Sequence, residues 1–183
     1  MLVLLNGYPG VGKTAIGRIV AERMPARFLD IHTVYNVAFA LTEFRTPAFY
    51  DTVRAVAAVA DARIRALPAG EPVVLTTVLT EGPSDWAREE WARLSSLGAH
   101  RAPFVVVHLD CALPENERRI ASPERIALRK PRDPEMARRN HAGGRPLAGG
   151  DLPHVLRLDV TKLSPDASAE RILRHLEGIA PGS

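Results

Sequence analysis

The chain has 183 residues, of which 46% are hydrophobic and 25% are charged, as in ordinary globular proteins and unlike disordered chains. This length fits one domain, so we expect residues 1–183 to fold as a single unit. The formal net charge is only +3, from 24 basic and 21 acidic residues, which is too small an excess to indicate a nucleic-acid partner.

Membrane insertion and an oxidising compartment are both disfavoured. The apolar stretch Met1–Leu5 is too short to span a bilayer and lacks the basic leader of a signal peptide. The single cysteine, Cys111, excludes an intrachain disulfide and a cysteine-built zinc site. We therefore expect a cytoplasmic protein with no membrane partner, present as a monomer or a homodimer.

Short apolar runs, typical of strands that are buried on both faces, recur along the chain. These runs are Leu2–Leu5, Arg27–Ile31, Val73–Leu79, Phe104–Leu109 and Val155–Leu158. Apolar residues with helical spacing lie between or after them, in Ile16–Met24, Val53–Leu67 and Ile172–Ile179. Such alternation predicts an α/β fold with five parallel strands and helices on both faces of the sheet.

Helix starts are marked by hydroxyl side chains that can cap a helix. Thr46-Pro47 and Ser164-Pro165 each place a capping hydroxyl before a proline at the first helical position, and Ser84 precedes a further apolar pattern. Residues 121–153 differ, because they are rich in proline, glycine and arginine and have little apolar periodicity. They predict a mobile surface excursion, which is either an ordinary loop or a lid over a ligand.

The segment Gly7–Thr14 matches the phosphate-binding pattern G-x-x-x-x-G-K-[ST], directly after a predicted strand and before a predicted helix. In this P-loop the backbone N–H groups and the helix dipole face the phosphates of a nucleoside triphosphate. Lys13 is expected to reach the β- and γ-phosphates, and the Thr14 hydroxyl to bind Mg²⁺. The predicted nucleotide-binding residues of this motif are Gly7, Pro9, Gly10, Val11, Gly12, Lys13, Thr14 and Ala15.

Two other classes of P-loop protein fit the sequence poorly. GTPases would need an Asn-Lys-x-Asp motif and an Asp-x-x-Gly motif, and neither occurs in the chain. An AAA-type machine or a helicase would need a longer chain and an acid at the end of the third strand, but the acid nearest to that run is Glu81. A compact kinase that uses ATP remains.

In its P-loop and its arginine-rich segment, the chain resembles the small P-loop kinases of the shikimate kinase and gluconate kinase group. Relatives of that group include chloramphenicol phosphotransferase, the tunicamycin-resistance protein and the zeta-toxin kinases. The closest likeness is to the shikimate kinase-like ATPases, whose lid reads much like Ile120–Arg125 followed by Asp133–Glu135. The resemblance implies a three-layer P-loop NTPase sandwich with strand order 2-3-1-4-5, ATP and Mg²⁺ as cofactors, and a small-molecule hydroxyl acceptor.

The resemblance also implies roles near the acceptor. Asp30 falls where such kinases carry an acid that deprotonates or orients the acceptor hydroxyl and helps to hold Mg²⁺. His32 follows it and would contact the acceptor, and Glu81 stands just after the third strand, where it would bind the acceptor. Each residue also has a structural alternative. Asp30 could cap a helix that begins at Thr33, His32 could be a capping or solvated histidine, and Glu81 could be a solvent-facing acid.

For the nucleotide side, the resemblance implies that Arg119 stacks on adenine and that the lid residue Arg125 neutralises the transferring phosphoryl group. Asp159–Thr161 would form the adenine-side wall. Neighbouring basic residues could share these roles, or form a solvated face; they are Arg118, Arg129, Lys130 and Arg132.

Departures from the shikimate kinase pattern lie at acceptor-binding positions. The chain has Asp30-Ile31-His32 in place of Asp-x-Asp and Glu81-Gly82 in place of Gly-Gly, and Arg145-Pro146-Leu147 resembles a lid motif but comes far later. We therefore expect an acceptor other than shikimate. The rival hypothesis is a nucleotide-binding regulatory or resistance module that binds or hydrolyses ATP without a dedicated acceptor.

Overall fold

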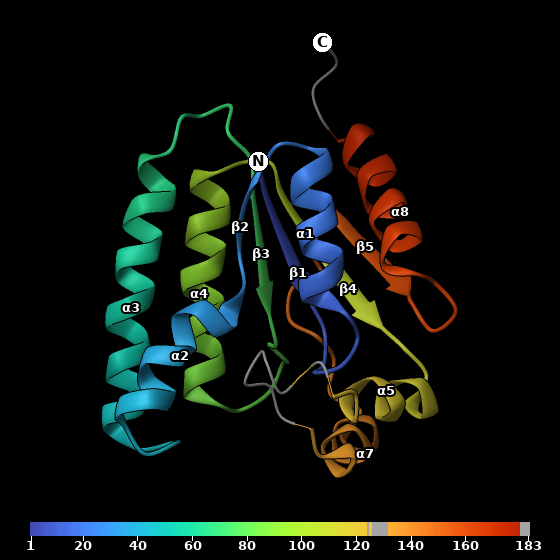
Figure 1. Ribbon diagram of the computed structural model, residues 1–183. Helices are drawn as coiled ribbons and strands as arrows, with labels where there is room; N and C mark the ends of the chain where they lie inside the picture. Colours follow the sequence, from blue (N-terminus) through green and yellow to red (C-terminus); the bar gives the residue numbers. More distant parts are fainter. Residues whose placement is uncertain (124, 126–131, 180–183) are drawn as a thin grey trace.

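The computed structural model describes residues 1–123, 125 and 132–179. Five strands form one parallel sheet, and its order is β2-β3-β1-β4-β5, which confirms the expected order (Figure 1). The strands are β1 (Leu2–Asn6), β2 (Arg27–Leu29), β3 (Val73–Thr77), β4 (Phe104–Asp110) and β5 (Val155–Asp159). The central strands are continuous runs of aliphatic residues because both of their faces are covered.

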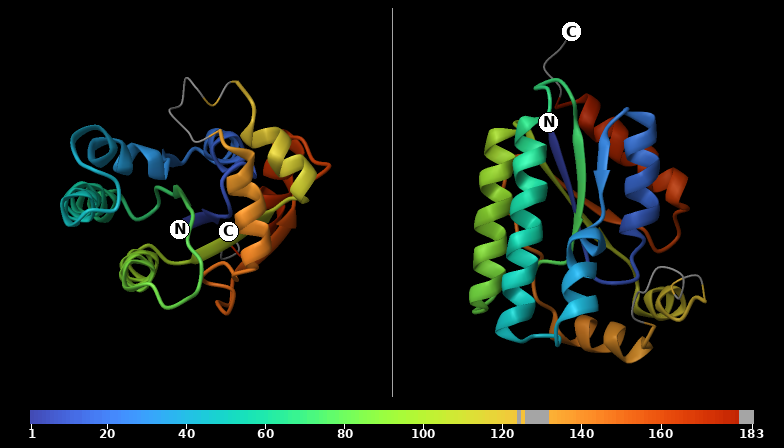
Figure 2. Two further views of the ribbon diagram at one scale, coloured as in Figure 1. Left: turned by 90° about the horizontal axis from the view of Figure 1, so that it is seen from below. Right: turned by 60° about the vertical axis from the view of Figure 1, so that its left-hand side comes forward.

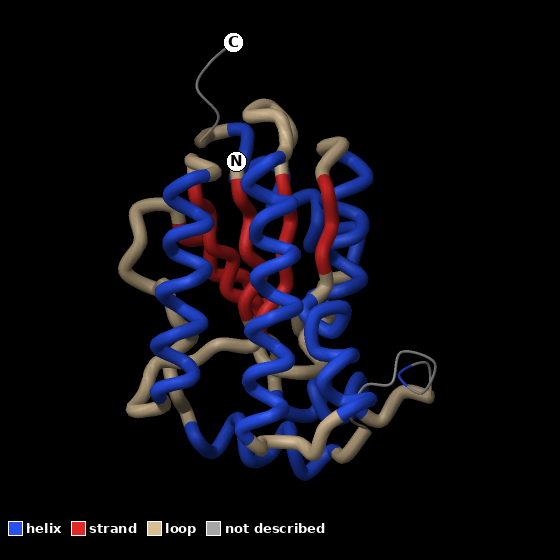
Figure 3. The backbone as a smooth tube through the Cα atoms, turned by 90° about the vertical axis from the view of Figure 1, so that its left-hand side faces the viewer, coloured by secondary structure: helices blue, strands red, loops and turns tan. Residues whose placement is uncertain are grey.

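Helices cover both faces of the sheet. The apolar residues of β1 alternate between two cores: Val3 and Leu5 pack with α1 (Lys13–Arg23) and α8 (Pro165–Glu177), whereas Leu2 and Leu4 pack with the other helical layer. That second layer consists of α3 (Pro47–Ala66) and α4 (Asp85–His100). In Figure 3 the strands run through the middle of the molecule with helices on either side. The predicted three-layer α/β fold is confirmed.

Three shorter helices lie at the carboxyl ends of the strands, where ligands of parallel sheets bind. They are α2 (Ile31–Leu41), α5 (Leu113–Ile120) and α7 (Pro134–Gly143). Seen from that end, α5 and α7 lie on the side of β4, and α2 and α3 lie on the opposite side (Figure 2). None of the described helices is long and apolar enough to cross a lipid bilayer.

The predicted helix caps are confirmed. Thr46 accepts a hydrogen bond from the backbone N of Phe49 at 3.3 Å, Ser84 caps α4, and Ser164 caps α8. Two predicted strands are shorter than the apolar runs, since β2 ends at Leu29 and β3 at Thr77. The first is shortened because Asp30 caps α2, so that Ile31 already begins a helix.

Residues 132–153, the later part of the predicted excursion, contain regular structure and buried positions. They contain α7, whose cap Asp133 accepts a hydrogen bond from the N–H of Glu135 at 2.9 Å. Farther on, Leu147 forms an antiparallel bridge with Thr80, and Ala148 is only 5% exposed. The prediction of a surface excursion is therefore wrong for its last part, because backbone pairing with the loop after β3 holds this part against the sheet.

Candidate active site

The P-loop joins the end of β1 to the start of α1 at the carboxyl edge of the sheet. Gly10 and Gly12 have φ angles of 95° and 101°, which side chains with a Cβ rarely adopt, and Gly12 is the cap of α1. A Cβ on Gly10 would lie 2.5 Å from Nδ2 of Asn116. The loop therefore needs its glycines to wrap, and the remaining predicted nucleotide-binding residues of the motif lie within it or in the first turn of α1: Gly7, Pro9, Val11, Lys13, Thr14 and Ala15.

The Lys13 ammonium lies inside this loop. Its Nζ donates hydrogen bonds to the carbonyl oxygens of Gly7 at 2.6 Å and Tyr8 at 3.0 Å, and the residue is only 8% exposed. Because an ammonium binds phosphate oxygens through stronger, charge-assisted hydrogen bonds, this group is positioned to exchange loop carbonyls for an anionic ligand.

Thr14 and Asp30 meet directly. The Thr14 hydroxyl donates a hydrogen bond to Oδ2 of Asp30. The other carboxylate oxygen, Oδ1, accepts from the backbone N of His32 at 3.0 Å and from Oγ1 of Thr76 at 3.3 Å. Asp30 thus caps α2, which begins at Ile31 and not at Thr33, and it also faces the start of α1. Asp30 can cap α2 and contact Thr14 at the same time, because the cap uses Oδ1 and the contact uses Oδ2.

This pair suits a magnesium ion by its chemistry. Hydroxyl and carboxylate oxygens are hard ligands, and Mg²⁺ in nucleotide sites is commonly bound by one or two such groups together with phosphate oxygens. Thr14 and Asp30 lie close enough to contribute to one coordination shell. The donor set predicted from the sequence therefore fits the ion.

His32 and Glu81 lie in different places. His32 is in the first turn of α2, partly buried and next to Asp30. Glu81 is exposed, its backbone N donates to the carbonyl of Pro146 at 2.8 Å, and it lines a cleft of about 570 Å³. The structure thus brings His32 to Asp30, whereas Glu81 faces a cleft whose lining includes neither of them.

Arg119 links the P-loop to the loop after β5. Its guanidinium donates to the carbonyl oxygens of Val11 at 3.2 Å and Val160 at 2.8 Å, and it pairs with Glu115 at 2.6 Å. Hydrogen bonds from Arg118 and then from Arg119 lower the pKa of Glu115 to about 2. The guanidinium is therefore held between the two segments that the sequence assigns to the nucleotide.

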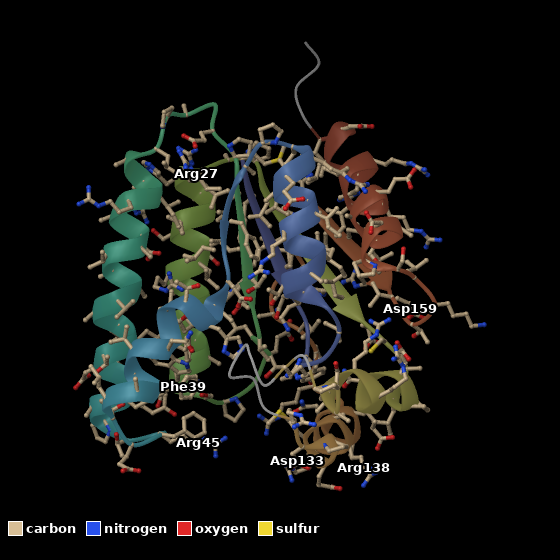
Figure 4. The ribbon with its side chains drawn as sticks, viewed as in Figure 1. Arg27, Phe39, Arg45, Asp133, Arg138 and Asp159 are labelled. Atoms are coloured by element: carbon tan, nitrogen blue, oxygen red, sulfur yellow. The ribbon has the colours of Figure 1, made fainter. Side chains whose placement is uncertain are left out.

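The predicted adenine-side wall lies beside it. Asp159 ends β5, near α5 (Figure 4), and accepts a hydrogen bond from the backbone N of Thr161 at 2.8 Å. Hydrogen bonds from Thr161 lower the pKa of Asp159. The Thr161 hydroxyl in turn accepts from the backbone N of Ala112 at 2.8 Å, which fixes the loop after β5 to the start of α5.

The basic residues of the predicted lid differ in their surroundings. Arg125 is partly buried, which lowers the pKa of its guanidinium, and its backbone N donates to the carbonyl of Ser122 at 3.2 Å. Arg118 pairs with Glu115, and Arg132 donates to the carbonyl of Ala121 at 3.3 Å. The two other candidates, Arg129 and Lys130, lie outside the described residues.

Three polar residues of the site escaped sequence analysis. Asn6, at the end of β1, exchanges hydrogen bonds with the backbone of Leu79, and Thr76 contacts Asp30. Asn116 is fully buried on α5 and donates to the carbonyl of Pro9 at 2.9 Å. Asn6 and Thr76 carry one detectable signal, because a polar residue at the carboxyl end of a buried parallel strand often faces a ligand site. Asn116 carries none.

Several solved structures that are similar to this one are named as kinases. A sugar kinase from Janibacter sp. HTCC2649 is 21% identical, with a TM-score of 0.63 and coverage of 98% of this chain and 95% of that one. A gluconokinase from Sinorhizobium meliloti 1021 is 16% identical, with a TM-score of 0.63 and coverage of 97% and 92%. Shikimate kinase from Acinetobacter baumannii is 17% identical, with a TM-score of 0.60 and coverage of 99% and 95%. At these identities the likeness establishes the fold.

Sequence comparison gives the family. No curated protein matches the sequence. The AAA domain family matches residues 3–140, which contain the P-loop, Asp30 and four of the five strands. The match spans well over half of the chain, and its fold is that of the small P-loop kinases, as the resemblance implied. The chain therefore belongs to the AAA domain family.

Proposed function

We propose that this protein is an ATP-dependent phosphotransferase that moves the γ-phosphoryl group of Mg-ATP to a hydroxyl group of a small molecule. The observation that carries the proposal is the contact between Thr14 and Asp30, which sets a carboxylate beside the phosphate-binding loop. The kinases of the same fold, described as acting on sugars, gluconate and shikimate, support it.

The nucleotide would bind along the P-loop. Its β- and γ-phosphates would accept hydrogen bonds from the N–H groups of the loop and from the Lys13 ammonium. The ammonium would then give up its hydrogen bonds to the carbonyls of Gly7 and Tyr8. The adenine would lie against the planar guanidinium of Arg119, between the P-loop and Asp159–Thr161. Arg125 would approach the phosphoryl group from the lid side.

Transfer needs a base and a nucleophile in line with the γ-phosphorus. The acceptor hydroxyl oxygen forms the new bond to phosphorus, the bond to the bridging oxygen of ADP breaks, and the hydroxyl proton passes to Asp30. His32 would hold the acceptor next to that carboxylate. Thr14 and Asp30 would hold Mg²⁺, which neutralises phosphate charge when it is bound. Most of the rate gain in this chemistry comes from such positioning and charge neutralisation.

The position of the acid favours transfer over mechanical work. The carboxylate at Thr14 comes from the end of β2, whereas β3 ends in Thr76 and Thr77. An ATP-driven machine would carry its acid at the end of the third strand, and the description of the AAA domain family does not decide between the two activities. The chain therefore lacks the residue that the machine would require.

The test is ATP consumption by the purified protein with Mg²⁺, alone and with a panel of sugars, nucleosides, antibiotics and other hydroxyl compounds. An acceptor should raise turnover many-fold, and Lys13→Ala should abolish it. Asp30→Asn should lower turnover by about 10²-fold or more while ATP still binds. Asp51→Asn, which changes an exposed acid on α3, is the matched control and should leave turnover unchanged.

Two results would contradict the proposal. Full acceptor-dependent turnover by Asp30→Asn would remove Asp30 as the base. ATP binding with no response to any acceptor would favour the regulatory module, in which Asp30→Asn is tolerated.

A further inference from the structure

Aromatic side chains gather on the helix that follows the proposed base. The chain contains five phenylalanines, three tyrosines and two tryptophans, and six of these ten residues form one cluster of neighbouring rings. The members of this aromatic cluster are Tyr35, Phe39, Phe44, Phe49, Tyr50 and Trp86. Two of them belong to α2, whose cap is Asp30. The cluster is therefore joined to the candidate active site by a single helix.

Two rings of the cluster face solvent. Phe39 is 48% exposed and Phe44 is 60% exposed, and no other aromatic residue of the chain is exposed, all ten being described. Both rings pack on the buried ring of Phe49, with centroids 5.2 Å from its centroid in each case. Exposed apolar side chains that are gathered in one place commonly mark a binding surface.

The loop between α2 and α3 fixes the more exposed ring. Arg45 has a φ of 66°, which residues other than glycine seldom adopt, and its guanidinium lies 5.1 Å from the centroid of the Phe44 ring. The Thr46 hydroxyl donates to the carbonyl of Glu43 at 2.7 Å. Phe39 and Arg45 lie at the same corner of the molecule (Figure 4). The surface is thus formed without a ligand, which lowers the entropy cost of binding one.

The helix α2 carries no charged residue. Its sequence from Ile31 to Leu41 lacks aspartate, glutamate, lysine and arginine, although 25% of the whole chain is charged. A surface helix usually presents charged side chains on its solvent face, but the exposed positions here include Thr33, Asn36 and Phe39. A charged ligand would find no opposite charge on this helix, so its surface suits an uncharged ligand.

Helix geometry connects the exposed rings to the candidate active site. His32, next to Asp30, is in the first turn of α2, and Phe39 follows it by seven positions. Seven residues make nearly two full turns, so the two side chains project from the same side of the helix, about 10 Å apart along its axis. Tyr35 lies between them, and its ring centroid is 6.1 Å from that of Phe39. One molecule about 10 Å long can therefore reach both ends of this face.

We propose that Phe39 and Phe44 form an apolar subsite for the acceptor. The acceptor is then an uncharged hydroxyl compound with an aromatic or other large apolar group about 10 Å from the hydroxyl that is phosphorylated. The inference rests on the proposed function and names its substrate class. Aromatic side chains bind such groups by burying apolar surface and by ring contacts.

A protein partner fits this surface less well. A stable protein interface buries roughly 800 Å² on each side. Two half-exposed phenylalanines offer only on the order of 200 Å². The other exposed apolar residues of α2, Val37 and Leu41, stand two positions before and after Phe39 and so project from the opposite side of the helix. The size of the surface therefore matches one ring system.

The experiment compares three primary alcohols: 6-phenoxyhexan-1-ol, hexan-1-ol and 4-(6-hydroxyhexyloxy)benzoate. The second lacks the ring, and the third carries a negative charge on it. Binding to the full chain is measured by calorimetry without nucleotide. The first compound should bind at least about tenfold more tightly than either of the others, because only it places an uncharged ring on the apolar subsite.

Variants locate the ring. The double variant Phe39→Ser, Phe44→Ser should weaken binding of 6-phenoxyhexan-1-ol by about tenfold and leave that of hexan-1-ol unchanged. In acceptor kinetics it should raise KM by about tenfold and change kcat less than about threefold, because the ring binds away from the reacting atoms. Phe44→Ser alone should give a loss of about threefold. Val59→Ser, at a 65% exposed position of α3, is the matched control, and an ATP titration shows that each variant is folded.

The outcomes separate the two proposals. Equal binding of the alcohols, no binding of any of them, or a preference that the folded variants keep would overturn the inference. A dimer that the double variant dissociates, seen by sedimentation, would overturn it too, since a second copy would then cover the rings. Ring-dependent binding with no phosphoryl transfer to any compound would instead contradict the proposed function and leave the apolar subsite standing. A polar acceptor that the double variant phosphorylates at full rate would overturn the inference alone.

Discussion

Thr76 holds Asp30 from the neighbouring strand. The Thr76 hydroxyl donates a hydrogen bond to Oδ1 of Asp30 at 3.3 Å. Oγ1 of Thr76 also accepts a hydrogen bond from the backbone N of Ile31 at 3.0 Å. Thr76 therefore fixes both the carboxylate and the chain that follows it. The other oxygen of Asp30 accepts from Thr14, so the orientation of the proposed base depends on Thr76 of β3 as well as on Thr14 of the P-loop.

Thr76→Val should lower turnover by about tenfold while changing the KM for ATP less than threefold, because it loosens the proposed base and leaves the P-loop intact. Thr76→Ser should restore most of the rate. Steady-state kinetics with an acceptor measure both parameters. Thr77→Val is the matched control, since Thr77 is buried on the same strand and its hydroxyl bonds to no described residue. Equal losses in the two variants would refute a positioning role.

Glu115 should stabilise the protein at neutral pH and lose that effect in acid. Its pKa is lowered to about 2 in the folded chain by Arg118 and Arg119, against an ordinary value of 4.5. A lowered pKa stabilises the fold above about pH 4.5, and this contribution disappears as the pH falls toward 2. Glu115→Gln should therefore cost about 1 kcal/mol of unfolding free energy at pH 7 and much less near pH 2.

Urea unfolding of both proteins at the two pH values measures this difference. Glu170→Gln removes the exposed pair with Arg174 on α8 and should cost about 0.5 kcal/mol or less at either pH. A penalty for Glu115→Gln that persists unchanged near pH 2 would show that the charge of Glu115 is not its cause.

Gly10→Ala should damage the P-loop. Its φ of 95° is unfavourable for alanine, and the new Cβ would lie 2.5 Å from the buried amide of Asn116. We expect a loss of about 2 kcal/mol in unfolding free energy, together with weaker ATP binding. Thermal unfolding and an ATP titration measure the two effects. Gly70→Ala, with no atom within 4 Å of its Cβ position, should change neither, and equal behaviour of both variants would disprove the steric argument.

Cys111 should be almost inert in the folded protein. The residue is 1% exposed, and burial raises the pKa of its thiol to about 11. At pH 8 only about 0.1% of the thiol would be ionised, and the thiolate is the reactive form. A disulfide exchange reagent should react about a hundredfold more slowly in buffer than in denaturant. Rapid labelling of the folded chain would show that the α1 and α8 side of the sheet opens.

Local sequence patterns were sufficient to predict the strands, the helix starts and the phosphate-binding part of the site. Aliphatic runs mark strands that are covered on both faces, and hydroxyl–proline pairs mark helix starts, because both depend on neighbouring residues. The P-loop is equally local, since one strand, one turn and one helix end complete it. Asp30 could be placed at the same edge of the sheet because all parallel strands end there.

Long-range pairing decided the remainder. The sequence of residues 144–151 predicts an irregular proline- and glycine-rich loop. The structure instead holds this segment against the sheet, because its backbone pairs with the loop after β3. Asn116 supports the P-loop from a helix about a hundred residues away in the chain. Sequence by itself determined the order of the elements and the phosphate-binding loop, whose contacts lie within a few residues. Only the tertiary structure decided which polar side chains meet at the ends of different strands, because those contacts arise when distant segments pack together.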